Sequence, residues 1–174
     1  MSVMFTLTGA EQMKATLAKL GADAPRAAGA ALYQEAERIM ARAKEMTPVD
    51  MGPLWTSGHV QLPKLTATAA TVVMGFGGAA APYALYVHEG IGPAVGRPAF
   101  MPPSNVLEGW VRRNIGGSAA DIKRIAFLVA RVIGRRGLRP TKFLERAVFE
   151  ARAGFEQRVA RRLQAWIARP RVGA

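Results

Sequence analysis

The 174-residue chain contains no cysteine and only two histidines. Without cysteine it can form no disulfide, and it offers no thiolate for catalysis or for metal binding. The histidines, His59 and His88, lie in separate segments, and neither a His-x-x-x-His pattern nor a further carboxylate cluster accompanies them. We therefore expect no metal site and no cofactor, and we expect that the protein is not an enzyme.

Two segments contain the residue types of a known motif without its spacing. Asp50, Ser57 and His59 supply the types found in a catalytic triad, but no Gly-x-Ser-x-Gly surrounds the serine. The glycine-rich residues 75–78 lack the Lys-Ser/Thr pair that completes a phosphate-binding loop. A hairpin turn is the better interpretation of this segment.

The sequence also lacks a long uninterrupted apolar run. The longest, from Ile125 to Ile133, is broken by Arg131, whereas a membrane-spanning helix needs roughly 20 apolar residues. The first eight residues are too short and too polar for a secretory signal peptide. We expect no membrane partner, and we expect residues 1–174 to form a single domain.

Positive charge is in marked excess, and it is confined to the last third of the chain. The net charge is +12, from 24 basic and 12 acidic residues. Residues 1–111 contain eight of each sign, so residues 112–174 contain 16 basic and four acidic residues. Such a region favours an acidic protein surface or a phosphate backbone as its partner, or it forms a solvated helical face. The residues that we assign to a basic surface for an acidic partner or DNA are Arg112, Arg113, Arg131, Arg135, Arg136 and Arg139.

Hydrophobic spacing predicts five helices. They are expected over residues 10–20, 25–46, 104–114, 118–133 and 141–168. Ser104 and Ser118 are expected to cap the third and fourth helices, and Asp121 completes an approximate capping box with Ser118. Gly134 and Gly137 are expected to end the fourth helix.

Alternating residues predict strands in the remaining segments. They are expected over residues 3–8, 59–65, 67–76 and 82–89. In the last of these, Tyr83 and Tyr86 fall on opposite faces, so one ring is expected to be buried and the other exposed. The predicted fold is α+β, with a small antiparallel sheet of three to four strands. This sheet packs against a long helix from the N-terminal half and a long C-terminal helix, and a helical pair is inserted.

Three segments, in this order, resemble segments of one protein family. Thr47-Pro48-Val49-Asp50-Met51-Gly52-Pro53-Leu54, followed by Ser57-Gly58, is similar to a "TPVDTG-x-L…S" turn. Residues 81–90, APYALYVHEG, are similar to a "PYAxYVExG" strand, and residues 139–144, RPTKFL, are similar to a "P-x-PFL" start of a final helix. The family comprises the tail-completion, or head–tail joining, proteins of long-tailed bacteriophages. Residues 104–137 resemble a helical insertion that some members carry.

The resemblance implies a structural protein of the virion. Its subunits would form a homo-hexameric ring at the head-proximal end of the tail and help to join the tail to the DNA-filled head. The implied partners are an adjoining connector (stopper) ring and the tail terminator or tail tube proteins, with possible non-specific contact with genome DNA. The implied location is the head–tail interface of the virion, after synthesis in the cytoplasm of the bacterial host.

The residues that we assign to subunit or ring interfaces are Asp50, Gly52, Leu54, Tyr83, Tyr86, His88, Glu89, Arg97 and Phe100. Residues 91–103 contain four prolines and are long for a connection within a compact domain, so we hypothesise that they reach a neighbouring subunit or ring. The alternative interpretation of the chain is a basic DNA-binding accessory protein that uses the arginine-rich C-terminal third.

Overall fold

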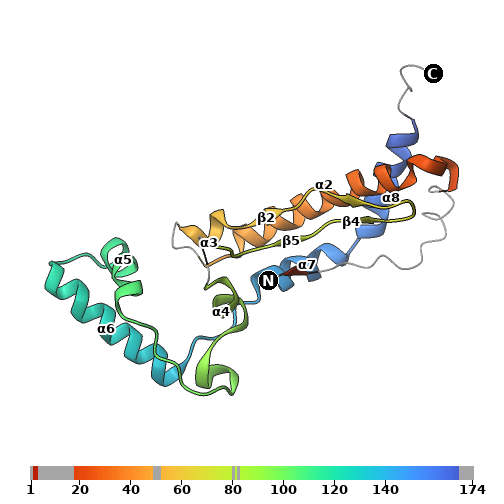
Figure 1. Cartoon of the computed structure of the whole chain (residues 1–174). Helices are drawn as coiled ribbons and strands as arrows, with labels where there is room; N and C mark the ends of the chain where they lie inside the picture. The colour runs from red at the N-terminus through yellow and green to blue at the C-terminus, as the bar shows by residue number, and fades with distance from the viewer. Residues whose placement is uncertain (1, 4–17, 49–51, 80, 82, 169–174) are drawn as a thin grey trace.

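The computed structural model describes residues 2–3, 18–48, 52–79, 81 and 83–168 (Figure 1). The described residues contain seven α-helices and several short antiparallel strands, so the α+β class is confirmed. The expected strand over residues 3–8 and the expected helix over 10–20 fall largely outside the described residues. Of these segments, Ser2–Val3 form β1 and residues 18–20 are helical.

The long helix α2 (Ala24–Glu45) runs the length of the main body, as the sequence predicts. Pro25 stands in its first turn, where a residue without an amide hydrogen breaks no helical bond. The helix ends shortly before Pro48, because the residue before a proline disfavours helical geometry. One face of α2 is buried against the strands and against the C-terminal helices.

The strands are much shorter than expected, at two residues each. The first set pairs in the order β1-β5-β2, and a separate hairpin pairs β3 with β4. Their bounds are His59–Val60 for β2, Lys64–Leu65 for β3, Ala70–Thr71 for β4 and Met74–Gly75 for β5. The single sheet of three to four strands is therefore not confirmed. Pro63 explains one interruption, because proline donates no ladder hydrogen bond.

Residues 84–89 form a helix, α4 (Ala84–Glu89), so the strand predicted there is wrong. Burial follows helical spacing, since Ala84 and His88 are buried four residues apart. Tyr83 and Tyr86 consequently do not divide between a buried and an exposed face. Their residues are 40% and 49% exposed.

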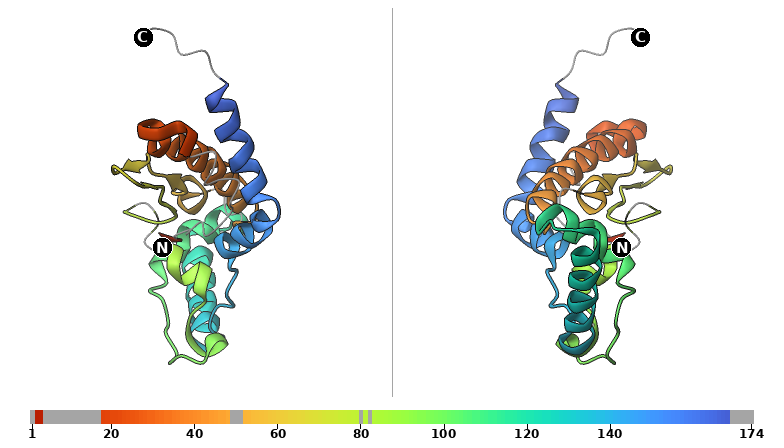
Figure 2. Two further views of the ribbon diagram at one scale, coloured as in Figure 1. Left: turned by 90° about the vertical axis from the view of Figure 1, so that its right-hand side faces the viewer. Right: turned by 90° about the vertical axis from the view of Figure 1, so that its left-hand side faces the viewer.

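The single C-terminal helix predicted over residues 141–168 is also wrong, because it is two helices. These are α7 (Phe143–Arg152) and α8 (Phe155–Ile167). Gly154 separates them with a φ of 70°, a left-handed conformation that glycine adopts without strain. Figure 2 shows α8 turning away from α7, so that α8 crosses the N-terminal half of α2.

Two hydrophobic clusters hold the main body together. The larger joins α2, α3 (Pro53–Thr56), β5, α4 and α7. At its centre Phe143 packs edge-on against Phe76 and His88, with ring centroids 4.9 and 5.1 Å apart. The smaller cluster joins α2 to α8 through Ala31 and Leu163.

Two further helices, α5 (Asn105–Asn114) and α6 (Ala119–Arg136), form what we call the arm. The arm lies beyond the end of α2 in Figure 1 and below the α2–α8 layer in Figure 2. Its helices pack against each other through Val111, Ile122 and Ala126. Both helices are confirmed, whereas the interpretation of residues 104–137 as an insertion stays a prediction.

The capping predictions for the arm have mixed outcomes. Ser118 accepts a hydrogen bond from the backbone N–H of Asp121 at 3.2 Å, so the predicted cap of α6 is confirmed. Ser104 occupies the N-cap position of α5, but its side chain makes no capping hydrogen bond. Gly137 ends α6, with a φ of 75°. Gly134 does not end the helix; it lies buried within α6, where an added Cβ would stand 3.0 Å from Cβ of Met101.

Candidate interaction surface

The end of α4 and the start of α7 meet in a polar junction. The hydroxyl of Thr141 donates a hydrogen bond to the carbonyl of Val87 at 2.8 Å. The backbone N–H of Lys142 donates to the carbonyl of His88 at 3.1 Å, and the N–H of Glu145 donates to His88 Nε2 at 3.4 Å. The structure thus brings together two of the segments on which the resemblance rests.

Glu89 sits at this junction between two partners. Its Oε2 lies 2.5 Å from Nζ of Lys142, and its Oε1 lies 2.9 Å from Nδ1 of His88. The hydrogen bonds from Lys142 and, secondly, from His88 lower the pKa of Glu89. The hydrogen bond to Glu89 in turn raises the pKa of Lys142. Because the side chains of Glu89 and Lys142 are 34% and 38% exposed, solvent screening keeps the attraction modest.

The arm joins the body through two segments that we call the neck, residues 90–92 and 137–140. The backbone N–H of Ile91 donates to the carbonyl of Leu138 at 3.0 Å, and the N–H of Leu138 donates back at 2.9 Å. Gly137, with its φ of 75°, comes so close to this pair that an added Cβ would lie 2.2 Å from the carbonyl oxygen of Ile91. Only glycine fits this position without a rearrangement of the neck.

The residues predicted to form interfaces are spread over several places. Leu54 and His88 are buried, at 5% and 2% exposure, so they support the fold and do not present a surface. Glu89 belongs to the polar junction, and Gly52 is the N-cap residue of α3. Asp50 lies outside the described residues.

The remaining predicted interface residues are exposed. Tyr83 and Tyr86 flank the start of α4, while Arg97 and Phe100 lie between the short 3-10 helix η2 (Gly92–Val95) and α5. The interface role of all these residues stays a prediction.

The six arginines assigned to a basic surface are all exposed, and all belong to the arm and neck. Arg112 and Arg113 lie on α5. Arg131, Arg135 and Arg136 lie on α6, and Arg139 lies in the neck. Residues 104–139 contain eight basic and two acidic residues, a net charge of +6. The structure therefore gathers half of the chain's net charge into its projecting part.

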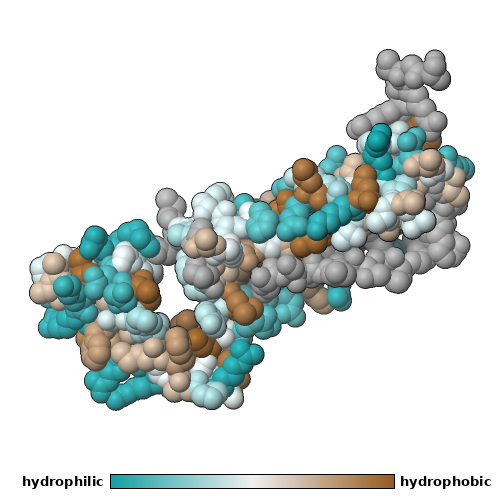
Figure 3. All heavy atoms as spheres, in the orientation of Figure 1, coloured by the Kyte–Doolittle hydropathy of each residue, from teal (hydrophilic) through white to brown (hydrophobic). Residues whose placement is uncertain are grey.

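The arm also exposes large hydrophobic side chains. On α5, Val106 and Trp110 stand one turn apart at 65% and 36% exposure. On α6, Leu128 and Val132 stand one turn apart at 50% and 51% exposure. Figure 3 shows hydrophobic and hydrophilic residues side by side on the visible face of the arm. Apolar groups therefore lie among the arginines of the arm.

The body exposes hydrophobic side chains more sparsely. Leu62, in the segment between β2 and β3, is 77% exposed, and Phe149 on α7 is 70% exposed. Trp55 on α3 is half exposed, with Nζ of Lys44 5.1 Å from the centre of a ring of its side chain. Single exposed hydrophobic residues of this kind are common on protein surfaces.

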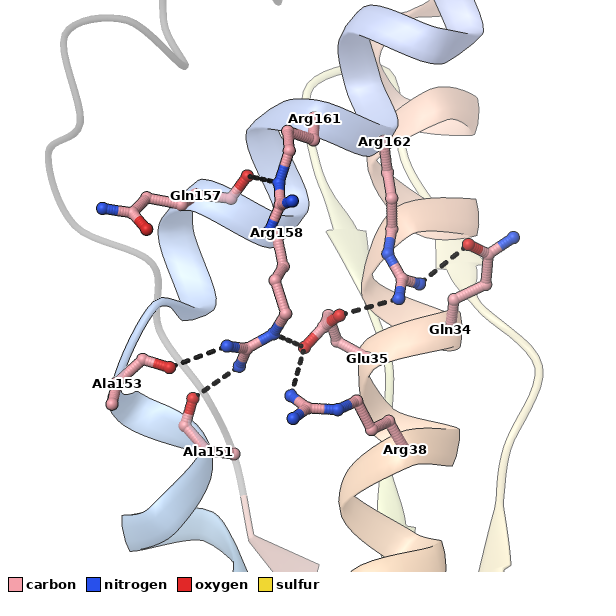
Figure 4. A network of polar contacts seen from close by, with 9 residues as sticks. All are labelled: Gln34, Glu35, Arg38, Ala151, Ala153, Gln157, Arg158, Arg161 and Arg162. Carbon is pink, nitrogen blue, oxygen red and sulfur yellow. Dashed lines mark hydrogen bonds and ion pairs between the residues drawn. The ribbon is translucent and has the colours of Figure 1, made fainter.

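A buried ion-pair network was not foreseen from the sequence (Figure 4). Glu35 on α2 is fully buried, and its Oε2 accepts a hydrogen bond from Nε of Arg158 at 2.8 Å. Arg162 Nη2 lies 2.9 Å from the other carboxylate oxygen, and Arg38 lies 3.8 Å from Oε2. The network fastens α8 to α2.

Two sequence signals could have revealed this network. Glu35 lies four residues after Ala31 and four before Ile39, in register with buried residues of α2. Arg158 and Arg162 stand one turn apart on α8 and so can reach the same carboxylate. A charge at a core position needs an opposite charge nearby.

Searches against protein-family models, curated proteins and solved structures found no match to this chain. Across the part of the chain that the structure describes, no helix combines the length and the apolar character needed to cross a membrane. In the same residues, no group of three or more His, Asp or Glu side chains is placed to hold a metal ion.

Proposed function

We propose that this protein is a structural subunit of the head–tail connector of a long-tailed bacteriophage. In this proposal it is a tail-completion protein that joins the tail to the DNA-filled head. Its subunits assemble into a ring, and binding energy rather than chemical catalysis does the work. Because a ring repeats the same contact around its axis, weak contacts per subunit add up to tight joining.

The observation that carries an assembly role is the uneven distribution of uncovered hydrophobic surface. Seventeen large hydrophobic residues are exposed among the described residues, and nine of them fall between positions 100 and 138. That region is the arm with the segments next to it. Concentrated apolar surface on a projecting element is typical of a protein that is completed by contact with other chains.

The bacteriophage context rests on the sequence resemblance. One of the resembling segments, residues 81–90, is similar to a family strand but is helical here over residues 84–89. Residues 81–90 and 139–144 are similar to family segments, and they are in contact through Thr141 and Lys142.

The proposal is tested by deleting the gene from the phage that encodes it and imaging the products by negative-stain electron microscopy. We expect DNA-filled heads and complete tails that remain separate, and we expect the wild-type protein supplied in trans to restore joined particles. Normal joined particles in the deletion strain would overturn the proposal.

A DNA-binding accessory protein is the second candidate, favoured by the exposed arginines of the arm. Electrostatic binding to DNA weakens steeply with salt, because each neutralised phosphate releases counterions. This candidate expects tight, strongly salt-dependent binding of the purified protein to a DNA duplex. The absence of binding at physiological salt would exclude it.

A further inference from the structure

The covered apolar face of α6 continues around the helix into an apolar stripe that the arm leaves partly uncovered. The inner face contains Ile122, Ala126 and Ala130, which are all buried. This outer stripe contains two exposed residues, Leu128 and Val132, and two half-buried residues at its border with the covered face, Ile125 and Val129. Of these, Ile125 packs against the cluster inside the arm. These four positions follow the i, i+3, i+4, i+7 spacing of one helical face.

A row of arginines borders the outer stripe along one edge. Arg124, Arg131 and Arg135 are exposed, and their spacing of seven and four residues places them on one line of the helix. An amphipathic helix fits an apolar stripe of this spacing, with its own apolar residues seated on the stripe. Arg124 is already paired with Asp121 at 3.4 Å, so carboxylates along the edge of the bound helix would pair with Arg131 and Arg135.

We propose that the outer stripe of α6 is a docking site for an acidic amphipathic helix of another protein. The bound helix lies along α6, buries Leu128 and Val132, and places its carboxylates against Arg131 and Arg135. The inference rests on the proposed function in one respect only: the protein that supplies the acidic helix is taken to be a neighbouring component of the same assembly.

A second copy of this chain fits the stripe poorly. Antiparallel pairing of two α6 helices about Leu128 would set Arg124 of one copy near Arg131 of the other, with Asp121 near Arg135. Like charges that face each other across an interface disfavour association, and both arms carry a net charge of +6.

Nucleic acid and lipid also match only part of the surface. A phosphate backbone would pair with the arginines, but it would gain nothing from contact with Leu128 and Val132. A lipid surface needs a broad apolar face with large side chains. The stripe instead offers two exposed aliphatic residues in a narrow line.

The test uses the purified full-length protein and two fluorescent helical peptides of about five turns, the length of α6. Both peptides carry leucine at the same helical-face positions; one carries glutamate at the flanking positions and the other carries lysine. Fluorescence anisotropy measures binding. We expect the glutamate peptide to bind and the lysine peptide to bind at least about tenfold more weakly.

Two protein variants then separate the apolar and the charged contributions. L128D/V132D should weaken binding of the glutamate peptide at least about tenfold, because each aspartate places a charge in the apolar contact. R131E/R135E should weaken the glutamate peptide and strengthen the lysine peptide. The matched control is L62D, which makes the same kind of change at an exposed leucine of the body and should leave binding unchanged.

Several results would overturn the proposal. They are failure of the glutamate peptide to bind, equal binding of the two peptides, and unchanged binding by L128D/V132D. If sedimentation shows that the wild-type protein and L62D self-associate and that L128D/V132D does not, the stripe binds a second copy of this chain. If L128D/V132D loses binding to a DNA duplex or to anionic vesicles while its binding to the peptide is unchanged, the stripe binds DNA or lipid instead. Because no phage particle is involved, these outcomes are independent of the head–tail joining test.

Discussion

Replacing Arg158 with alanine should destabilise the protein more than any other single change at an arginine of α8. The side chain is 18% exposed, and it donates to Glu35 at 2.8 Å and to the carbonyls of Ala151 and Ala153 at 2.7 Å each. It therefore satisfies both the buried carboxylate and the C-terminal end of α7. Figure 4 shows these contacts converging on one guanidinium group.

The magnitude follows from the buried ion pair. Removing one partner of a buried ion pair costs about 3–5 kcal/mol, because the other charge is left uncompensated. Glu35 keeps Arg162 at 2.9 Å, so the lower end of that range applies, and we expect R158A to lose about 3 kcal/mol. For a chain of this length, such a loss lowers the melting temperature by roughly 6–12 °C.

The assay is urea and thermal unfolding followed by far-ultraviolet circular dichroism. The matched control is R161A, since Arg161 is exposed and, among the described residues, its side chain donates to the carbonyl of Gln157 at 3.4 Å. That variant should stay within about 0.5 kcal/mol of the wild type. R158K should fall between the two, because an ammonium group keeps the charge but lacks the planar fork. Equal stability of R158A and R161A would refute the reasoning.

Two further predictions concern the junction and the neck. The Lys142–Glu89 pair should stabilise the fold by about 1 kcal/mol. The pKa of Glu89 is lowered in the folded protein. The stability that the pair contributes is therefore present above pH 4.5, the ordinary pKa of a glutamate, and is lost as the pH falls through the lowered pKa. The pKa of Lys142 is raised in the folded protein. The same stability is therefore lost at high pH, as the pH rises above 10.5, the ordinary pKa of a lysine, and through the raised pKa. K142M should therefore lower the melting temperature near neutral pH, and this effect should shrink as the pH falls through the lowered pKa of Glu89; an effect that does not change with acidification would contradict this prediction. G137A should cost about 2–3 kcal/mol in urea unfolding, because its Cβ would overlap the carbonyl of Ile91. In the control G116A, where the φ is also positive but no atom lies within 4 Å, the loss should stay near 1 kcal/mol; equal losses would argue against the close approach.

The long elements could be predicted because several signals agree within each of them. Helix α2 combines a proline start with a sustained apolar stripe, and α6 combines its spacing with the Ser118–Asp121 cap. Such agreement leaves few alternatives. The six residues of α4 are too few to separate a helical from an alternating period, and their packing against the start of α7 favours the helix.

The break at Gly154 was missed because apolar spacing continues from Ala151 to Phe155 across it. A glycine in the middle of a helical pattern was the available signal. The outer stripe of α6 was missed for a different reason. Sequence spacing groups Ile122, Ile125 and Val132 as one apolar set, and only the packing of α5 shows which of them face outward. The exposed arginines, by contrast, follow directly from composition.

The central claim is that this protein joins finished tails to filled heads, and complementation in vitro tests it most directly. Extracts of cells infected with a deletion phage would be mixed with the purified protein, and infectious particles would be counted. We predict that the wild-type protein and L62D restore joined, infectious particles, and that an equal amount of an unrelated basic protein does not. Joining at the same frequency without added protein would contradict the account.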